Sequence, residues 1–123
     1  MFGKLFRGKG YELTLNRVHD ILTVKEGDER ITLTVNGDAM RMVAGLNKAQ
    51  AKMNALTEDS PDDEAKEAAN YFAAVLFGKE QAEKLMAFYA DDPGCVIALC
   101  GQYFKERLAG KITEAQKKLK DHA

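Results

Sequence analysis

Apolar and polar residues alternate along the first third of the chain, which is the pattern of half-buried β-strands. Residues 11–15 and 31–35 show the alternation most clearly, the β-rich residues 21–24 lie between them, and the polar residues 26–29 mark a turn. The pattern predicts an antiparallel β-hairpin or a three-stranded meander over residues 11–37, with one apolar face. Because a sheet this small is marginal alone, helices are expected to cover that face.

Helical spacing of the apolar residues begins after Asp38, which can cap a helix once the strand ends at Asn36 and Gly37. Gly45 inside this helix either costs about 1 kcal/mol relative to alanine or lets a neighbouring helix approach closely. The methionines favour core packing, with an adaptable binding surface as the alternative. The apolar face of this helix comprises Ala39, Met42, Val43, Leu46, Ala49, Met53 and Leu56.

The next expected helix ends at Phe77. Ser60 is expected to cap its start, because a serine hydroxyl can accept from the N–H groups of the first turn, and Pro61 suits the first helical position. Gly78 is expected to end the helix in a left-handed conformation. Since Gly78 leaves almost no linker, the following helix should meet this one at a sharp corner.

Two more helices follow with start and stop signals of the same kind. The first is expected over residues 79–90. Asp92 and Pro93 then repeat the cap-and-proline signal and open another helix, which Gly110 is expected to close.

A capping box formed by Thr113 and Gln116 predicts a further short, basic helix near the C-terminus. The 123 residues are therefore expected to form a single α+β domain that is mainly helical, with four to five helices and a small N-terminal sheet. Its expected parts are a basic arm (residues 1–10), a β meander (11–37), a helical body (38–110) and a basic C-terminal helix or tail (111–123).

The net charge of −1 gives no overall field that would favour nucleic acid or a membrane surface. Residues 57–92 carry ten acidic against three basic residues, and both ends of the chain are basic. A solvated acidic face with basic ends accounts for this distribution. No apolar run is long enough for a membrane span, and the first residues lack the apolar stretch of a secretory signal. A cytoplasmic protein without membrane contact is expected.

Residues that could carry chemistry are sparse. Cys95 and Cys100 lie on one expected helix with their Cα atoms about 8.6 Å apart, which is too far for a disulfide, and both are expected to be buried. His19, expected at a strand boundary, and His122 have no partner at metal-ligand spacing. The single serine, Ser60, is assigned to a helix cap. Neither an enzyme nor a metal or other cofactor is therefore expected.

Residues 70–85 read Asn-Tyr-Phe-Ala-Ala-Val-Leu-Phe-Gly-Lys-Glu-Gln-Ala-Glu-Lys-Leu, and an aromatic-containing helix and the run 112–118 follow. This part of the chain resembles small proteins encoded in the morphogenesis gene clusters of tailed phages and prophages of Gram-positive bacteria. Within those it is most similar to tail assembly chaperones and to related prophage proteins without an assigned role, over about residues 31–120. The resemblance implies a non-catalytic helper in the bacterial host cell that binds the long tape-measure protein of the tail, or prevents premature tail polymerisation.

Such a helper would need an apolar groove that accepts partner helices. Phe88 lies off the apolar stripe of its helix and is expected to be exposed. The substitution Phe88→Asp is expected to spare folding and to abolish partner capture. The candidate partner-binding surface comprises Met42, Leu46, Met53, Phe77, Phe88 and Tyr89.

Two other functions remain open from the sequence. A structural tail or head–tail connector subunit would assemble into oligomers through the edges of its strands. A stable ring in solution would favour that function, and a monomer or dimer would favour the helper. A small regulator that binds nucleic acid through the basic ends is the second alternative, and its binding would weaken steeply with added salt.

Overall fold

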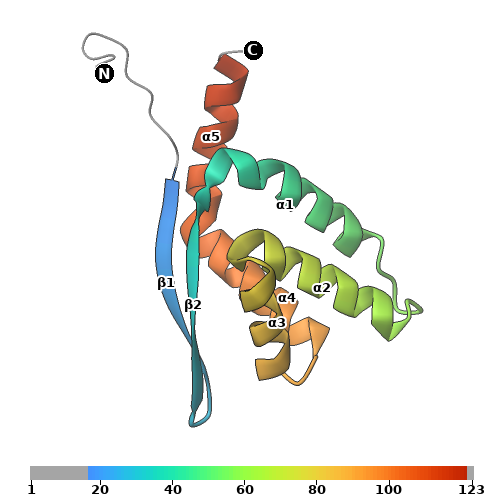
Figure 1. Cartoon of the computed structure of the whole chain (residues 1–123). Helices are drawn as coiled ribbons and strands as arrows, with labels where there is room; N and C mark the ends of the chain where they lie inside the picture. The colour runs from blue at the N-terminus through green and yellow to red at the C-terminus, as the bar shows by residue number, and fades with distance from the viewer. Residues whose placement is uncertain (1–16, 122–123) are drawn as a thin grey trace.

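The computed structural model describes residues 17–121, which form a β-hairpin followed by helices (Figure 1). The α+β, mainly helical fold class is therefore confirmed, with two strands in the described part. The expected basic arm and the strand expected at residues 11–15 lie outside the described residues. In chain order the elements are β1 (Arg17–Glu26), β2 (Glu29–Asp38), α1 (Ala39–Asn54), α2 (Asp62–Phe77), α3 (Lys79–Phe88), α4 (Pro93–Tyr103), the π-helical segment η1 (Phe104–Leu108) and α5 (Ala109–Asp121).

The hairpin is longer than the sequence pattern predicted, with ten residues in each strand. The strands pair antiparallel from Arg17 opposite Asp38 to Glu26 opposite Glu29. Gly27 has a φ of +63°, which the first position of a tight hairpin turn requires. Two boundary predictions were wrong: β2 continues through Gly37, and His19 lies within β1 rather than at its end. Pairing between β1 and β2 keeps these residues extended.

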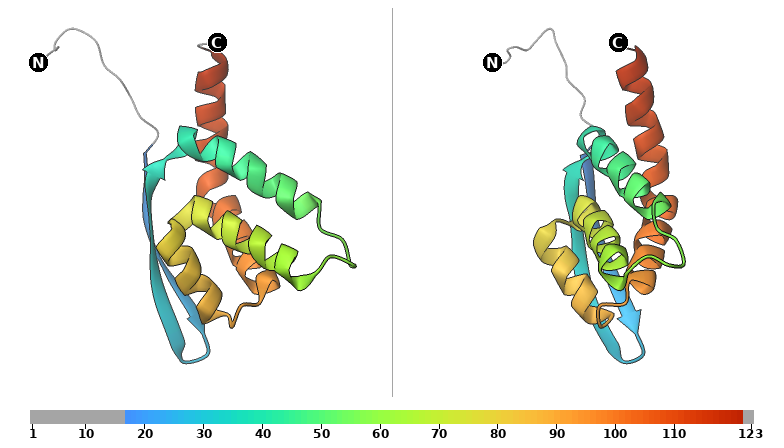
Figure 2. Two further views of the ribbon diagram at one scale, coloured as in Figure 1. Left: turned by 45° about the vertical axis from the view of Figure 1, so that its right-hand side comes forward. Right: turned by 90° about the vertical axis from the view of Figure 1, so that its right-hand side faces the viewer.

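The alternation in the strands separates a buried face from an exposed one, as the pattern predicted. Val18 and Val24 of β1 are buried together with Leu33 and Val35 of β2. The hairpin lies along one side of the helical body, and α2 lies at the centre of that body (Figures 1 and 2). The contacts of α2 with α1, α3, α4 and β2 make it the helix around which the core forms.

Two of the expected helix starts are confirmed. The Asp38 carboxylate accepts from the Met40 N–H at 2.9 Å and caps α1, and the Asp92 carboxylate accepts from the Gly94 N–H at 2.9 Å at the start of α4, with Pro93 in the first turn. These caps satisfy N–H groups that have no partner within the helix.

The cap expected from Ser60 was wrong. Pro61 precedes the first residue of α2, and no side chain caps this helix within the described part. The Ser60 hydroxyl instead accepts from the Thr57 N–H at 2.7 Å, inside the loop that joins α1 to α2. Serine hydroxyls stabilise turns in the same way as they cap helices, so the sequence signal is compatible with either role.

Gly78 separates α2 from α3 without any further linker, so the predicted sharp corner is present. Its φ of +91° and ψ of 159° differ from the left-handed helical conformation that was expected; they lie in a region that is essentially restricted to glycine. The next helix, α3, ends at Phe88, two residues before the predicted end. There Ala90 and Asp91 take positive φ angles, and the Asp91 N–H donates to the Met86 carbonyl at 2.8 Å.

The expected break at Gly110 was wrong, because α4, η1 and α5 run on as one long helix. Both views of Figure 2 show α5 continuing past α1, beyond the rest of the helical body. The capping box was also wrong: the Thr113 hydroxyl donates to the Ala109 carbonyl one turn earlier, at 2.9 Å. Burial of Leu108 and Ile112 on either side of Gly110 outweighs the helix penalty of about 1 kcal/mol for a glycine.

One continuous hydrophobic cluster joins the hairpin to all the helices. Cys100 is fully buried within it, whereas Cys95 is exposed, so burial was predicted correctly for Cys100 and wrongly for Cys95. Both cysteines are free thiols, as the spacing predicted. The largest fully buried side chains are those of Leu33, Leu85, Leu108, Val35, Val96 and Cys100.

Candidate partner-binding groove

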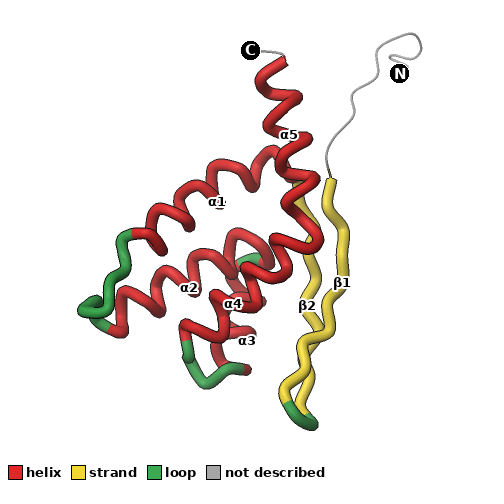
Figure 3. Tube along the Cα trace, turned by 180° about the vertical axis from the view of Figure 1, so that it is seen from behind, coloured by secondary structure: helices red, strands yellow, loops and turns green. Residues whose placement is uncertain are grey.

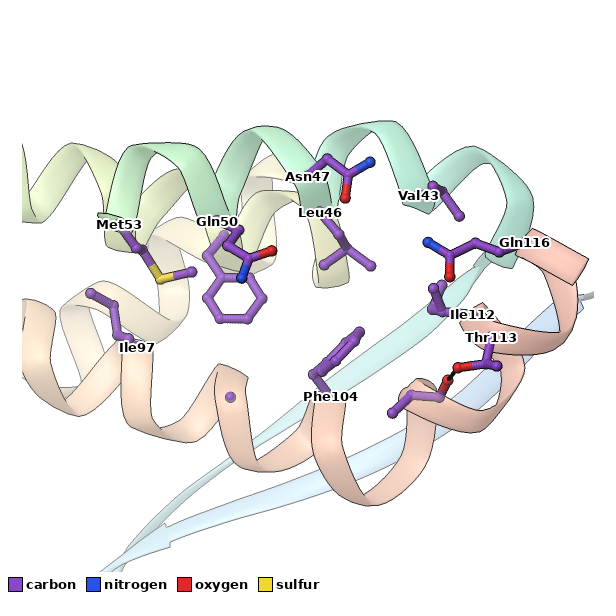
Figure 4. Close-up of a pocket in the computed structure, with 13 residues that line it drawn as sticks. Val43, Leu46, Asn47, Gln50, Met53, Ile97, Phe104, Ile112, Thr113 and Gln116 are labelled. Atoms are coloured by element: carbon purple, nitrogen blue, oxygen red, sulfur yellow. Dashed lines mark hydrogen bonds between the residues drawn. The ribbon is translucent and has the colours of Figure 1, made fainter. Parts of the chain in front are cut away.

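An apolar groove runs between α1 and the long helix formed by α4, η1 and α5 (Figure 4). Its volume is about 530 Å³. Phe72 of α2 contributes to the lining, and the two walls face each other across the gap. The lining residues are Val43, Leu46, Asn47, Gln50, Met53, Phe72, Ile97, Gly101, Phe104, Ala109, Ile112, Thr113 and Gln116.

The α1 wall is one face of a regular helix. Val43, Leu46, Gln50 and Met53 follow one another at intervals of three or four residues, which places them on the same side. In Figure 4 the side chains of Val43 and Leu46 point from α1 toward the opposite wall. Met53 lies ten positions after Val43, so this wall extends for about 15 Å.

The opposite wall depends on the π-helical segment. Ile97, Gly101 and Phe104 follow the ordinary helical interval, but the next lining residue is Ala109, five positions beyond Phe104. A π-helical turn has an i→i+5 repeat, and η1 covers this step. The extra residue keeps the groove-facing stripe continuous into α5, while Leu108 turns into the core and is fully buried.

The groove is suited to packing rather than to bond-making chemistry. None of its lining residues is charged, and the polar ones are amides and one hydroxyl: Asn47, Gln50, Thr113 and Gln116. These four side chains are exposed at the rim. Such a rim can exchange hydrogen bonds with polar groups of a bound peptide without holding a charge out of water.

The structure distributes the six residues of the predicted partner surface over three places. Leu46 and Met53 line the groove. Met42 and Phe77 are buried, at 8% and 6% exposure. Both border a different hollow, near the end of the hairpin, and the Phe77 ring packs on Tyr103 with 5.7 Å between ring centroids.

Phe88 and Tyr89 lie at the C-terminal end of α3, outside the groove lining. Their rings meet edge to face with 5.1 Å between centroids, and both residues are half-buried. Phe88 is therefore less exposed than its position off the helical stripe predicted.

The groove residues on the long helix were not included in the predicted surface. Ile97 and Phe104 lie on the helix that was expected to end at Gly110, and Ile112 lies in the stretch expected to form a basic C-terminal helix or tail (111–123). Because glycine was interpreted as a stop, the spacing from 97 to 116 was not recognised as one stripe. A five-residue step in an otherwise regular pattern is the signal that could have joined them.

The best-defined polar cluster ties the hairpin to the long helix. Asp20 accepts hydrogen bonds from Arg107 Nε at 2.9 Å and from the Tyr103 hydroxyl at 3.2 Å. The hydrogen bond from Arg107 holds the pKa of the Asp20 carboxyl below its usual value. Burial, followed by the Asp20 charge, raises the pKa of Tyr103 to about 12. Asp20 thus remains ionised and Tyr103 remains a donor at neutral pH.

Neither cysteine is activated as a nucleophile. Burial raises the pKa of the Cys100 thiol to about 12. Desolvation and the hydrogen bond with Asp92 raise the pKa of Cys95, whereas a reactive thiolate needs a lowered pKa. Within residues 17–121, no three histidine, cysteine or acidic side chains are grouped so that they could hold a metal ion.

None of the helices between residues 17 and 121 is both long and apolar enough to cross a membrane. Comparisons of the chain with protein-family models, with curated proteins and with solved structures return no match. The fold and the groove geometry therefore carry the functional argument.

Proposed function

We propose that the protein is a non-catalytic assembly helper that holds an amphipathic helix of a partner protein in the groove between α1 and the α4–η1–α5 helix. The observation that carries this proposal is the groove itself, with apolar walls, a rim of uncharged amides and no titratable group in its lining. Grooves between helices accept partner helices through apolar anchors spaced at i, i+3 or i+4, and i+7. A wall about 15 Å long matches roughly three turns of such a helix.

The resemblance of residues 70–85 to tail assembly chaperones favours a partner from a phage tail, with the tape-measure protein as the first candidate. A long tape-measure protein would expose apolar helical faces before the tail assembles around it. Holding one such face in the groove would keep it out of water and away from other copies. In this proposal the protein acts in the cytoplasm of the bacterial host and makes no covalent change in its partner.

A matched pair of glycine substitutions tests the groove. A Cβ added at Gly101, which lines the groove, or at Gly110, which does not, would have no atom within 4 Å. Gly101→Leu should fill the groove, and Gly110→Leu makes the same change on the same long helix outside it. We expect Gly101→Leu to lower affinity for the partner at least about tenfold, the equivalent of 1.4 kcal/mol, and Gly110→Leu to leave it unchanged.

The measurement is co-expression with the tape-measure protein of the same gene cluster, followed by co-purification and titration of the soluble complex. Equal binding by the two leucine variants would contradict the groove as the site. Phe88→Asp distinguishes the groove from the corner of α3. Retained capture by this variant supports the groove, and lost capture with an intact fold would move the site to Phe88 and Tyr89.

A further inference from the structure

The two outer edges of the hairpin differ in what covers them. The outer edge of β2 is covered by α3. Gln81 Oε1 accepts from the Thr34 N–H at 2.7 Å, and Gln81 Nε2 donates to the Thr34 carbonyl at 2.6 Å. Lys84 adds a longer contact from Nζ to the Thr32 carbonyl at 3.4 Å. The Gln81 amide therefore donates and accepts as a neighbouring strand would, which prevents further pairing at this edge.

Within residues 17–121, no helix or strand covers the outer edge of β1. Thr34 turns its backbone groups away from β1, and its cross-strand partner is Ile21, so the backbone groups of Ile21 must also point away from β2. The same holds for His19, Thr23 and Lys25 at two-residue intervals. Among residues 17–121, the Ile21 N–H bonds to the Asp20 carboxylate at 3.0 Å, and no other partner meets this row of groups.

The surroundings of this edge suit an added strand. Figure 3 shows β1 on the outer side of the sheet, with no described element beyond it. A hollow of about 420 Å³ lies between β1 and the α4–η1 wall and is lined in part by Leu22, Val24 and Leu99. Side chains of an added strand that point inward would enter this hollow. On the outer face Ile21 is 63% exposed, although it is a large apolar residue beside the edge.

We propose that β1 pairs antiparallel with β1 of a second copy of this chain, so that two hairpins form one four-stranded sheet across a two-fold axis. The argument for a second copy is closure. Within residues 17–121, each copy has one open edge and one edge closed by Gln81. An isologous β1–β1 contact therefore uses both open edges and leaves no other open edge in the described part of either copy. Pairing through a single edge yields a dimer and cannot propagate into a ring or a filament.

Threonines that lie opposite each other supply a matched test. Thr23 and Thr32 are cross-strand partners, one on each edge, and the N–H of each points away from the other strand. Thr23→Pro removes a donor at the open edge and Thr32→Pro removes one at the closed edge, where proline is tolerated. Because of the two-fold axis, Thr23→Pro removes two hydrogen bonds from each dimer. Two hydrogen bonds at about 0.5–1.5 kcal/mol each correspond to at least about a fivefold rise in the dimer dissociation constant.

The experiment is analytical ultracentrifugation of the full chain over a concentration series, with circular dichroism to verify folding. We expect a dimer for the unmodified chain and for Thr32→Pro, and a shift toward monomer for Thr23→Pro. Ile21→Lys, which adds a positive charge beside the open edge of each copy, should also weaken the dimer and serves if the proline variant does not fold. A monomeric unmodified chain, a larger ring, or a dimer that Ile21→Lys and Thr23→Pro leave intact would overturn the proposal.

Discussion

The two sides of α1 are packed in opposite ways. On one side Gly45 lies against Val75 of α2, so close that an added Cβ would lie 3.0 and 3.1 Å from the two Val75 methyl groups. On the other side, across the groove, an added Cβ at Gly101 would meet no atom within 4 Å. A loosely packed protein would show room on both sides. The contrast indicates that the groove is a local feature beside a tightly packed core.

The closed side owes its tightness to small residues. Ala69 and Ala73 of α2 and Ala49 of α1 are fully buried, and short side chains let helix backbones approach. On the open side, Leu46 and Phe104 face each other across the gap (Figure 4). On the side away from the groove, the long helix is bound to the hairpin by hydrogen bonds from Tyr103 and Arg107 to Asp20.

The largest expected change in stability comes from enlarging Gly45, on the side of α1 that packs against α2. Gly45→Leu forces a branched side chain onto Val75, and overpacking of this kind typically costs about 1–3 kcal/mol. Gly101→Leu places the same side chain in the groove and should change the free energy of unfolding by less than about 1 kcal/mol. Urea titration of both variants measures the difference. If Gly45→Leu proved as stable as Gly101→Leu, the α1–α2 contact would be looser than the structure indicates.

A smaller change in stability is expected from removing the hydrogen bonds that link Asp20 of the hairpin to the long helix. Asp20→Ala leaves the Tyr103 hydroxyl, on a buried residue, without its acceptor, and we expect a loss of about 1 kcal/mol. If this tie holds the long helix away from α1, the variant should also bind a partner helix less tightly. A stability loss with unchanged partner affinity would show that the groove stays open without the hairpin.

The Asp20 tie also predicts a pH dependence. Because the folded pKa of Asp20 is lowered from its usual value of 3.8, its contribution to stability is complete above that value and is lost as the pH falls through the lower folded pKa. Asp20→Asn does not titrate. The difference in unfolding free energy between the unmodified chain and Asp20→Asn should therefore be constant near neutral pH and shrink below about pH 4. If the difference in unfolding free energy stayed the same in acid, the contribution of Asp20 would come from its shape and not from its charge.

The sequence was sufficient for the fold class because its strongest signals are local. Alternation identified β2, and the β-rich run at residues 21–24 identified β1. Asp38 and Asp92 marked two helix starts that need only neighbouring residues to form. Gly110 failed as a stop signal because burial of distant residues decides whether a helix continues through a glycine.

The candidate site was harder to predict from the sequence than the fold. Leu46 and Met53 of the predicted surface line the groove, but the opposite wall of the groove depends on η1. A π-helical turn has no strong sequence signature, so the stripe from Ile97 to Gln116 appeared interrupted. The separation of Phe77 and Phe88 from the groove likewise follows from the corner at Gly78, whose direction no periodicity specifies.

The smallest expected effect is the most direct test of whether the groove is open in solution. Gly101→Ala adds one methyl group to a helix interior, where alanine is favoured over glycine by about 0.5–1 kcal/mol, and the structure shows free space for it. Gly110→Ala should give a similar gain, and the two gains should add because the sites do not share neighbours. Thermal and urea unfolding of the three variants measure these increments. If Gly110→Ala stabilises and Gly101→Ala does not, α1 must lie closer to α4 in the free protein than the structure shows, and a partner helix would have to open the groove before binding it.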